Sequence, residues 1–247
     1  MPRTARKISS SGFYHVISRG IGKQILFEED ADYSFFLGIL KKYWEEEQFD
    51  IIAYCLMENH FHLLLKIDSG LDRVMKKIAT SYAFYFNSKY ERNGHLFQDR
   101  YKSVPVENDS ALLCEVRYIH NNPAKAGICS ADRYRWSSWK AYAGEGGLVR
   151  TDPVLDLAGG LKGFLAFSGQ EDQEDTEYLD VTETRRLPDK TAREIIQEKL
   201  GMKSGTEVQR LARANRDAAL RKLKEEGLSV RQIERLTGIN RGVIQKA

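Results

Sequence analysis

Cysteine is scarce in this sequence of 247 residues, and its three copies form no CxxC pair. An odd number of scattered cysteines argues against a disulfide framework and favours reduced thiols. Long apolar runs are missing too: none approaches the roughly 18 residues that a membrane span needs, and no apolar signal core follows the basic N-terminus. The absence of a GxxxxGK[ST] loop argues against nucleotide hydrolysis by that route. Together these absences predict a cytoplasmic protein with no membrane segment.

The net charge of +3 hides an uneven distribution of charge along the chain. Residues 171–189 carry eight acidic and two basic side chains, whereas residues 191–247 carry seven acidic and 13 basic ones. We interpret the acidic stretch as an exposed linker and the basic tail as a separate folding unit. The predicted domains are therefore a body over 1–145, a helical extension with the linker over 146–190, and the tail over 191–247.

Apolar periodicity predicts that strands and helices alternate in the body. Residues 12–18, 49–67 and 96–106 are expected as strands, and residues 30–47, 70–90 and 108–122 as helices. Asn108 offers a cap for the third helix, and Pro123 is expected to end it. The order predicts an α+β fold, a ferredoxin-like sandwich in which helices pack on a small, mainly antiparallel sheet.

Two of the five histidines lie one residue apart in the central strand, as His60 and His62. Successive strand side chains point to opposite faces, so both imidazoles share one face and Phe61 lies on the other. Such a pair forms either half of a metal site or a hydrogen-bonded structural pair. A histidine triad hydrolase would need a third histidine where Leu64 stands. A two-histidine phosphoesterase would need hydroxyls two residues after each histidine, and there are none.

A tyrosine nucleophile beside such a pair is a further possibility, because a helix places residues i and i+4 on one face. Three tyrosines have a carboxylate or amide four residues later: Tyr43 with Glu47, Tyr54 with Glu58, and Tyr118 with Asn122. Tyr54 lies on the predicted strand, and Tyr43 lies on the apolar stripe of its helix. Tyr118 lies away from the apolar stripe and shares a face with Glu115 and Asn122. Tyr118 is therefore the preferred candidate.

The segments YCLMENHFHLLL and RYIHNNPAKAG resemble the REP-associated tyrosine transposases, a group of single-tyrosine HUH transposases, over roughly residues 12–145. The resemblance implies that His60, His62 and Asn122 hold Mg²⁺ or Mn²⁺ and that Tyr118 is the nucleophile. It also implies that the chain nicks and rejoins palindromic or hairpin single-stranded DNA through a 5′-phosphotyrosine. Glu58 departs from the proline of the family pattern. The alternative is a non-catalytic DNA-binding regulator that keeps the fold.

Other residues of the body are candidates for DNA contacts or neighbours of the site. Aromatic and basic side chains suited to a DNA backbone or to base stacking are Arg100, Tyr101, Lys102 and Lys125, with a plain surface role as the alternative. His15 and His120 are interpreted as structural neighbours, with support of the metal ligands as the alternative. A homodimer is left open.

The basic tail has the layout of a helix-turn-helix. Ser229 is placed to cap a helix that runs to Leu236, and Asn240 is placed to cap a second one. In such a module the last helix enters the major groove of DNA. The residues predicted to face the groove are Arg241, Gln245 and Lys246. The alternative is a small helical module that binds protein.

Overall fold

The computed structural model describes residues 6–170, 189–202 and 204–247. The chain divides into two compact units, Met1–Val181 and Thr182–Ala247. Of the acidic stretch 171–189 that was predicted to be a linker, only Asp189 is described, and it begins a helix.

The first unit is built on a four-stranded antiparallel sheet with the strand order β2-β3-β1-β4. Its strands are β1 (Phe13–Arg19), β2 (Asp50–Met57), β3 (His60–Lys66) and β4 (Lys102–Val106). Strand β1 pairs with β3 on one side and with β4 on the other, so β4 is an edge strand. The predicted α+β class and antiparallel sheet are confirmed.

The single strand predicted over 49–67 is wrong, because that segment is a hairpin of β2 and β3. Only Glu58 and Asn59 separate the two strands. Both faces of the sheet are covered, so β2 and β3 are apolar almost throughout and the run of apolar residues hides the turn. The turn is held from outside, since the Glu58 carbonyl accepts hydrogen bonds from the backbone N–H groups of Leu26 and Phe27 at 2.7 and 3.1 Å.

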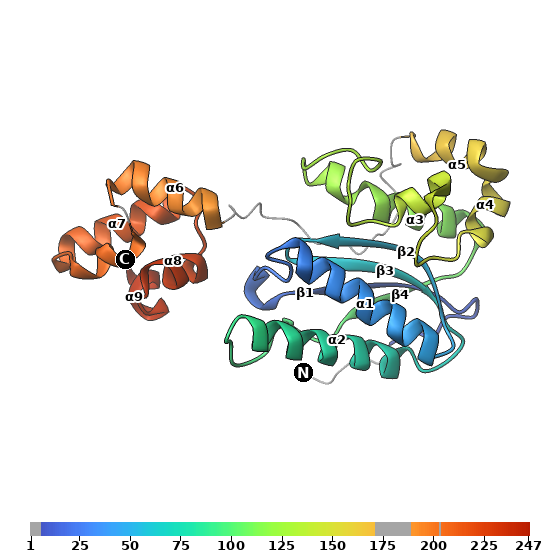
Figure 1. Ribbon diagram of the computed structural model, residues 1–247, viewed down its shortest axis with the longest axis horizontal. Coiled ribbons are helices and arrows are strands. Elements are labelled where there is room, and N and C mark those ends of the chain that lie inside the picture. Colours follow the sequence, from blue (N-terminus) through green and yellow to red (C-terminus); the bar gives the residue numbers. More distant parts are fainter. Residues whose placement is uncertain (1–5, 171–188, 203) are drawn as a thin grey trace. The chain divides into compact units, whose positions relative to one another are not determined.

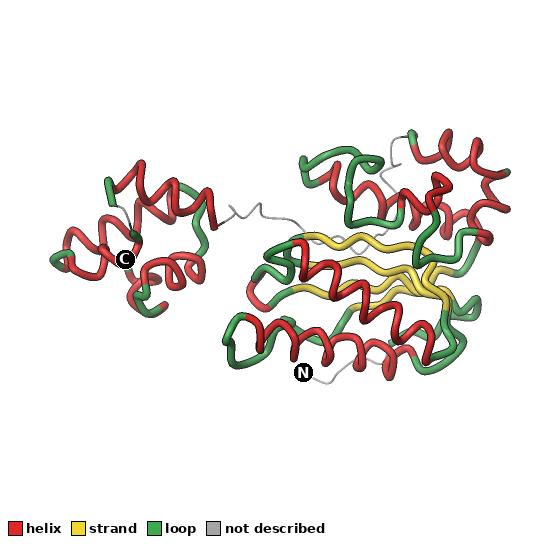
Figure 2. Tube along the Cα trace, in the orientation of Figure 1, coloured by secondary structure: helices red, strands yellow, loops and turns green. Residues whose placement is uncertain are grey.

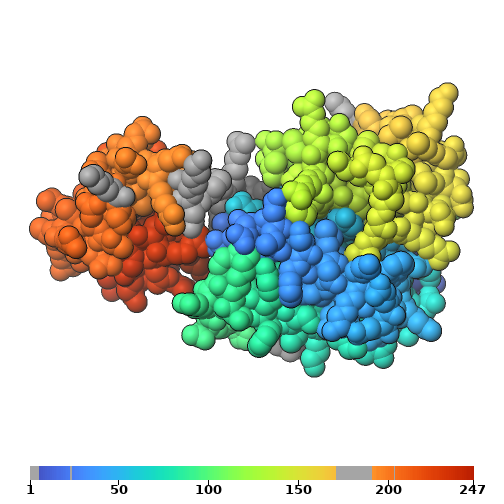
Figure 3. All heavy atoms as spheres, in the orientation of Figure 1, coloured from blue at the N-terminus to red at the C-terminus, as the bar shows by residue number. Residues whose placement is uncertain are grey.

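Helices α1 (Asp30–Glu46) and α2 (Leu71–Lys89) cover one face of the sheet, and α3 (Asp109–Lys125) covers the other (Figures 1 and 2). The core therefore has two halves. Phe36, Phe61 and Tyr82 are buried in the α1–α2 half, where the helix atoms form a closed surface (Figure 3). Val116 and Ile119 are buried in the α3 half. Because neighbouring strand residues alternate in direction, each strand supplies both halves.

Helix α3 continues past Pro123 to Lys125, contrary to the prediction that Pro123 ends it. Proline lacks an N–H group and disfavours a helical conformation in the residue before it. The Asn122 side chain compensates: its Nδ2 donates to the Tyr118 carbonyl at 2.9 Å and makes a longer contact of 3.5 Å with the Ile119 carbonyl. The Ile119 carbonyl is the one that an N–H at position 123 would have bonded. Asn122 is therefore held in the helix.

The aromatic segment after α3 packs back on the sheet. The Tyr134 hydroxyl donates to the Leu56 carbonyl at 2.7 Å, and the Tyr142 hydroxyl donates to the Ile52 carbonyl at 2.9 Å. Both acceptors lie on the outer strand β2. Two short helices follow, α4 (Asp152–Ala158) and α5 (Gly160–Ser168).

The described residues of the second unit form helices and the turns between them. Its helices are α6 (Asp189–Leu200), α7 (Arg213–Glu225), α8 (Val230–Thr237) and α9 (Arg241–Lys246), with a 3₁₀ turn at Gly205–Arg210. Both predicted caps are present: the Ser229 side chain accepts from the Gln232 N–H, and the Asn240 side chain accepts from the Gly242 N–H. Ile233 and Ile244 are fully buried between these helices. No described helix in either unit is long and apolar enough to cross a membrane.

Candidate functional site: a histidine pair beneath the tyrosine helix

His60 and His62 lie on β3, one of the two central strands, on the sheet face that α3 covers. His62 pairs with Ile17 on one side and with Cys55 on the other. The two histidine side chains are 1% and 0% exposed, and their ring centroids lie 5.0 Å apart. Neighbouring strands therefore fix both imidazoles side by side.

Both imidazoles are neutral at neutral pH. Burial lowers the pKa of His60 to about 3, with the nearby charge of Arg19 acting in the same direction. Burial also lowers the pKa of His62 well below its ordinary value. A neutral imidazole keeps a lone pair, which is the form that binds a metal ion.

A chain of contacts leads from α3 through β1 to His62. The Glu115 carboxylate oxygen Oε2 lies 3.0 Å from Nδ1 of His15, although the angle is not that of a straight hydrogen bond. Nε2 of His15 lies 2.8 Å from Nδ1 of His62. His15 is 0% exposed and Glu115 is 7% exposed, so water does not screen these contacts appreciably.

This chain of contacts favours one tautomer of His62. The carboxylate favours a proton on Nδ1 of His15, since two lone pairs would otherwise face each other. Nε2 of a neutral His15 is then an acceptor, so the proton of the 2.8 Å contact belongs to Nδ1 of His62. Nε2 of His62 is left unprotonated, and it is buried without a hydrogen-bond partner in the described part of the chain.

Tyr118 projects from α3 toward the histidines. Its ring centroid lies 5.8 Å from that of His62 and 5.8 Å from that of His15, in edge-on geometry with both. The Lys125 ammonium lies 4.3 Å from the centre of the tyrosine ring. The tyrosine, both members of the histidine pair and this cation thus form one cluster between α3 and the sheet.

Asn122 lies one helical turn after Tyr118, and its amide nitrogen is bonded to the Tyr118 carbonyl at 2.9 Å. Because the amide nitrogen donates to the backbone, Oδ1 is the side-chain atom of Asn122 that is able to act as a metal ligand. Within the described residues no group of three or more His, Cys, Asp or Glu side chains could hold a metal ion. A site here would combine two imidazoles with an amide oxygen, and the open Nε2 of buried His62 fits that donor set.

The structure gives two residues of this region, His15 and Glu115, contacts that were not predicted from the sequence. His15 was interpreted as a structural neighbour, but it contacts His62 directly. For Glu115 the sequence predicted only a position on the same helix face as Tyr118. His120 fits the structural interpretation, since it is fully buried with Nε2 2.8 Å from the Ser138 hydroxyl and a pKa lowered by burial to about 3. Two patterns in the sequence could have indicated these contacts. Strand alternation assigns His15 to one face of its strand, and the i+3 spacing places Glu115 on the same helix face as Tyr118.

Within the first unit, the predicted DNA contacts lie on both faces of the sheet. Lys125 adjoins Tyr118. Lys102 is opposite Ile17 in the β1–β4 register and so faces the histidine side of the sheet, whereas Arg100 and Tyr101 line a cavity on the other face. In the second unit Gln245 and Lys246 are exposed, and exposed Arg241 is paired with Glu234.

Comparison with known proteins defines the class. Residues 9–122, which include the histidine pair, Tyr118 and Asn122, match the family model described as "Transposase IS200 like". This part of the chain is therefore similar to the IS200-like transposases. Among curated protein sequences, none matches this chain.

One solved structure agrees with the fold of the first unit. The structure of a REP-associated tyrosine transposase bound to a REP hairpin is similar with a TM-score of 0.53 and 16% identity, covering 61% of this chain and 89% of the other. A crystal structure of a putative transposase from Deinococcus radiodurans R1 is 21% identical over 49% of this chain and 97% of the other, with a TM-score of 0.33. The first unit thus has the fold of a REP-associated tyrosine transposase.

Proposed function

We propose that this chain nicks and rejoins single-stranded DNA through a covalent bond to Tyr118. One observation carries the proposal: the tyrosine ring and both neutral histidines lie in one cluster, with Nε2 of His62 open. In the expected step, the Tyr118 hydroxyl attacks a DNA phosphorus, a P–O bond forms, and the P–O3′ bond breaks. The departing 3′ oxygen takes up the proton that the tyrosine hydroxyl loses and leaves as a 3′-hydroxyl.

A divalent ion, Mg²⁺ or Mn²⁺, held by His60, His62 and Oδ1 of Asn122, would polarise a phosphate oxygen. The resulting 5′-phosphotyrosine conserves the energy of the phosphodiester, so the 3′-hydroxyl can reverse the reaction without ATP. Lys125 is placed to contact the phosphate beside Tyr118. Because the cluster is enclosed by α3 and the sheet, we expect an unpaired strand rather than a duplex to reach it.

His15 and Glu115 are positioning residues in this proposal. Through His15, the Glu115 carboxylate holds His62 in the form whose Nε2 lone pair is free. Groups that orient metal-binding histidines in this way contribute about 10- to 100-fold to metal affinity. Their function is to present the ligand in one tautomer before the ion arrives.

The tautomer of His62 can be measured in the metal-free protein. Long-range ¹H–¹⁵N NMR should show His62 protonated at Nδ1 and unprotonated at Nε2. Glu115→Ala should disturb this preference and weaken Mn²⁺ binding about 10- to 100-fold. Glu115→Gln, which keeps an acceptor oxygen, should restore most of both properties. A proton on Nε2 of His62 in the wild-type protein would refute the assignment.

Palindromic or hairpin single strands are the substrates that we propose. The similar structure is described as bound to a REP hairpin, and that ligand belongs to the other protein. Lys102, exposed on the histidine side of edge strand β4, supplies a cation for the strand outside the cluster. A homodimer is compatible with the proposal and is not needed for the chemistry of Tyr118.

For the second unit we propose duplex or hairpin DNA binding through α9. Arg241 lies at the N-terminus of α9, and Gln245 and Lys246 are exposed on it. This is the helix that enters the major groove in a helix-turn-helix. Arg241 already pairs with Glu234 at 2.5 Å, so DNA binding would require it to exchange that partner for a phosphate or a base.

Removal of the second unit should separate chemistry from affinity. A chain that ends at Thr184 should still form the covalent adduct on a short oligonucleotide. It should bind long DNA more weakly and with a shallower dependence on salt, because fewer phosphates are neutralised. Adduct yield and the slope of log affinity against log salt are the two readouts. Lost adduct with an unchanged slope would show that the second unit serves the active site instead.

The alternative function is a DNA-binding regulator that keeps the fold without cleavage. Incubation of the protein with hairpin-forming single strands and Mg²⁺ or Mn²⁺ distinguishes the two functions. An enzyme yields a protein–DNA adduct that survives denaturation and disappears with EDTA. A regulator yields only a complex that denaturation dissociates.

A further inference from the structure

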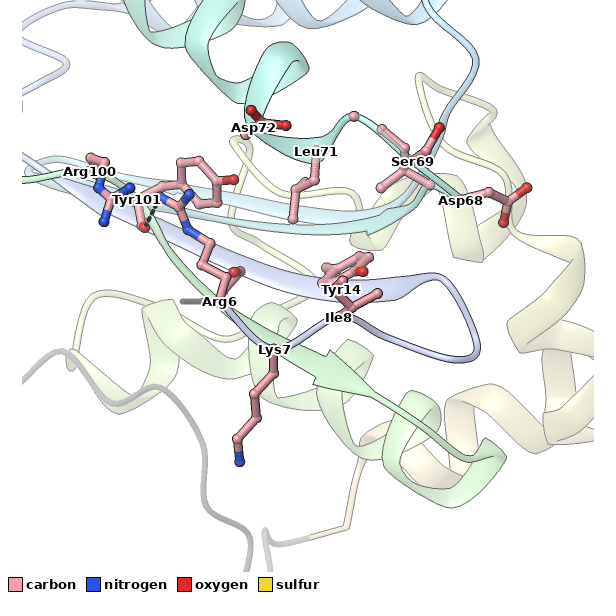
Figure 4. Close-up of a pocket in the computed structure, with 13 residues that line it drawn as sticks. Arg6, Lys7, Ile8, Tyr14, Asp68, Ser69, Leu71, Asp72, Arg100 and Tyr101 are labelled. Atoms are coloured by element: carbon pink, nitrogen blue, oxygen red, sulfur yellow. Dashed lines mark hydrogen bonds between the residues drawn. The ribbon is translucent and has the colours of Figure 1, made fainter. Parts of the chain in front are cut away.

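A cavity of about 550 Å³ lies on the face of the sheet opposite the histidine pair (Figure 4). It is bounded by the N-terminal segment, by β1, by the loop that leads into α2, and by the residues just before β4. Tyr14, which lines it, is the neighbour of His15 on β1 and therefore points to the other face. The cavity is thus separate from the Tyr118 cluster, although the same strand borders both.

A preformed stack of a cation on an aromatic ring forms one wall of this cavity. The Arg6 guanidinium carbon lies 3.8 Å from the centre of the Tyr101 ring, and the same side chain donates to the Tyr101 carbonyl at 3.3 Å. The Tyr14 hydroxyl accepts from the Ser9 N–H at 2.8 Å, which ties the N-terminal segment to β1. Flat guanidinium and phenol groups are the surfaces on which unpaired bases stack.

The polar groups around the cavity are of both signs. Arg6, Lys7 and Arg100 supply cations, and in Figure 4 Lys7 points away from the aromatic side chains. Asp72, in the first turn of α2, lines the cavity and supplies a carboxylate. A site for phosphate alone would gain nothing from that carboxylate. A nucleotide can use both, because its phosphate is an anion and the edge of its base carries hydrogen-bond donors.

We propose that this cavity binds one unpaired nucleotide of the DNA strand, with its base against the Arg6–Tyr101 stack and its amino group toward Asp72. The inference rests on the proposed function in taking single-stranded DNA as the partner. Because β4 is an edge strand, the DNA strand has only a short path between the cavity and the histidine side of the sheet. Lys102 faces the histidine side of the sheet and the adjoining Tyr101 and Ser103 line the cavity, so a strand can pass round that edge.

The carboxylate makes the site selective among bases. Adenine, cytosine and guanine carry amino groups that can donate to Asp72, whereas thymine has none. Single-stranded octamers of deoxyadenosine and deoxycytidine should therefore bind more tightly than an octamer of thymidine. Loss of one stacked aromatic ring costs about 1–3 kcal/mol per base, which corresponds to roughly 5- to 150-fold in affinity.

Fluorescence anisotropy with labelled octamers, the full-length chain and EDTA tests the site without any cleavage. Tyr101→Ala should weaken the deoxyadenosine and deoxycytidine octamers by at least about 5-fold. Asp72→Asn, at an exposed position, should remove the preference over thymidine, since an amide both donates and accepts. Phe84→Ala is the matched control: Phe84 is 78% exposed and lies about 20 Å further along α2, and its loss should change nothing.

The outcomes separate this inference from the proposed function. A base preference that both cavity variants leave intact, or no preference in the wild-type chain, overturns the nucleotide site even if the wild-type chain forms an adduct with DNA. A preference that Asp72→Asn abolishes supports the site even if no adduct ever forms. Should Tyr101→Ala fail to fold, as judged by circular dichroism, the Asp72→Asn result decides alone.

Discussion

Tyr118→Phe should abolish the covalent protein–DNA adduct while leaving the affinity for single-stranded DNA unchanged. The substitution removes only the attacking hydroxyl. The ring stays between His15, His62 and Lys125, where its edge-on contacts and its contact with the ammonium depend on the ring alone. The measurement is a denaturing gel with an oligonucleotide labelled at its 3′ end, because the fragment retained by the protein is the one with the 5′-phosphate.

Tyr43→Phe is the control for that experiment. Tyr43 also has a carboxylate residue four positions later, but it belongs to the α1–α2 half of the core and its hydroxyl bonds the Ser81 hydroxyl at 2.7 Å. Its substitution should leave the adduct yield intact. A normal adduct from Tyr118→Phe, or a lost adduct from Tyr43→Phe in a folded protein, would contradict the assignment of the nucleophile.

His60→Ala and His62→Ala should each reduce cleavage by more than about 100-fold and release Mn²⁺, because a site with three protein ligands holds an ion poorly with two. Asn122→Ala should have a smaller effect on cleavage, since an amide oxygen is the weakest ligand of the three. Mn²⁺ binding by electron paramagnetic resonance and adduct yield should fall together. His95→Ala, at an exposed histidine, is the matched control.

The same histidines predict the pH dependence of metal binding. Because burial lowers the pKa of His60 to about 3 and that of His62 well below its ordinary value, protons compete with the metal only in strong acid. Mn²⁺ affinity should therefore change little between pH 7 and pH 5. An exposed pair with ordinary pKa values near 6.5 would lose affinity steeply over that range.

Cleavage by His60→Ala at the wild-type rate, or wild-type activity in EDTA, would refute the metal site.

Much of the site was predictable because its geometry follows from local periodicity. Strand alternation alone places His60 and His62 on one face, and helical spacing alone places Asn122 one turn after Tyr118. The caps of the last two helices were equally local, since Ser229 and Asn240 bond N–H groups two or three residues away. Predictions of this kind need no knowledge of how distant segments meet.

Features that depend on distant segments were missed. The contact of His15 with His62 joins residues 47 positions apart, and only the register of β1 with β3 reveals it. The hairpin turn at Glu58 was hidden because helices cover both faces of the sheet and remove the polar alternation of its strands. Pro123 misled the prediction of the helix end because a side-chain bond from Asn122 replaced a backbone bond.

Mass spectrometry of the trapped adduct tests the central claim most directly. The wild-type chain would be incubated with a hairpin-forming single strand and Mn²⁺, denatured, and digested with nuclease and trypsin. We expect a nucleotide 5′-phosphate on the peptide that contains residues 118–125, carried by Tyr118, and no modification elsewhere. A nucleotide on another tyrosine, or no modified peptide under conditions in which the DNA is cut, would contradict Tyr118 as the nucleophile.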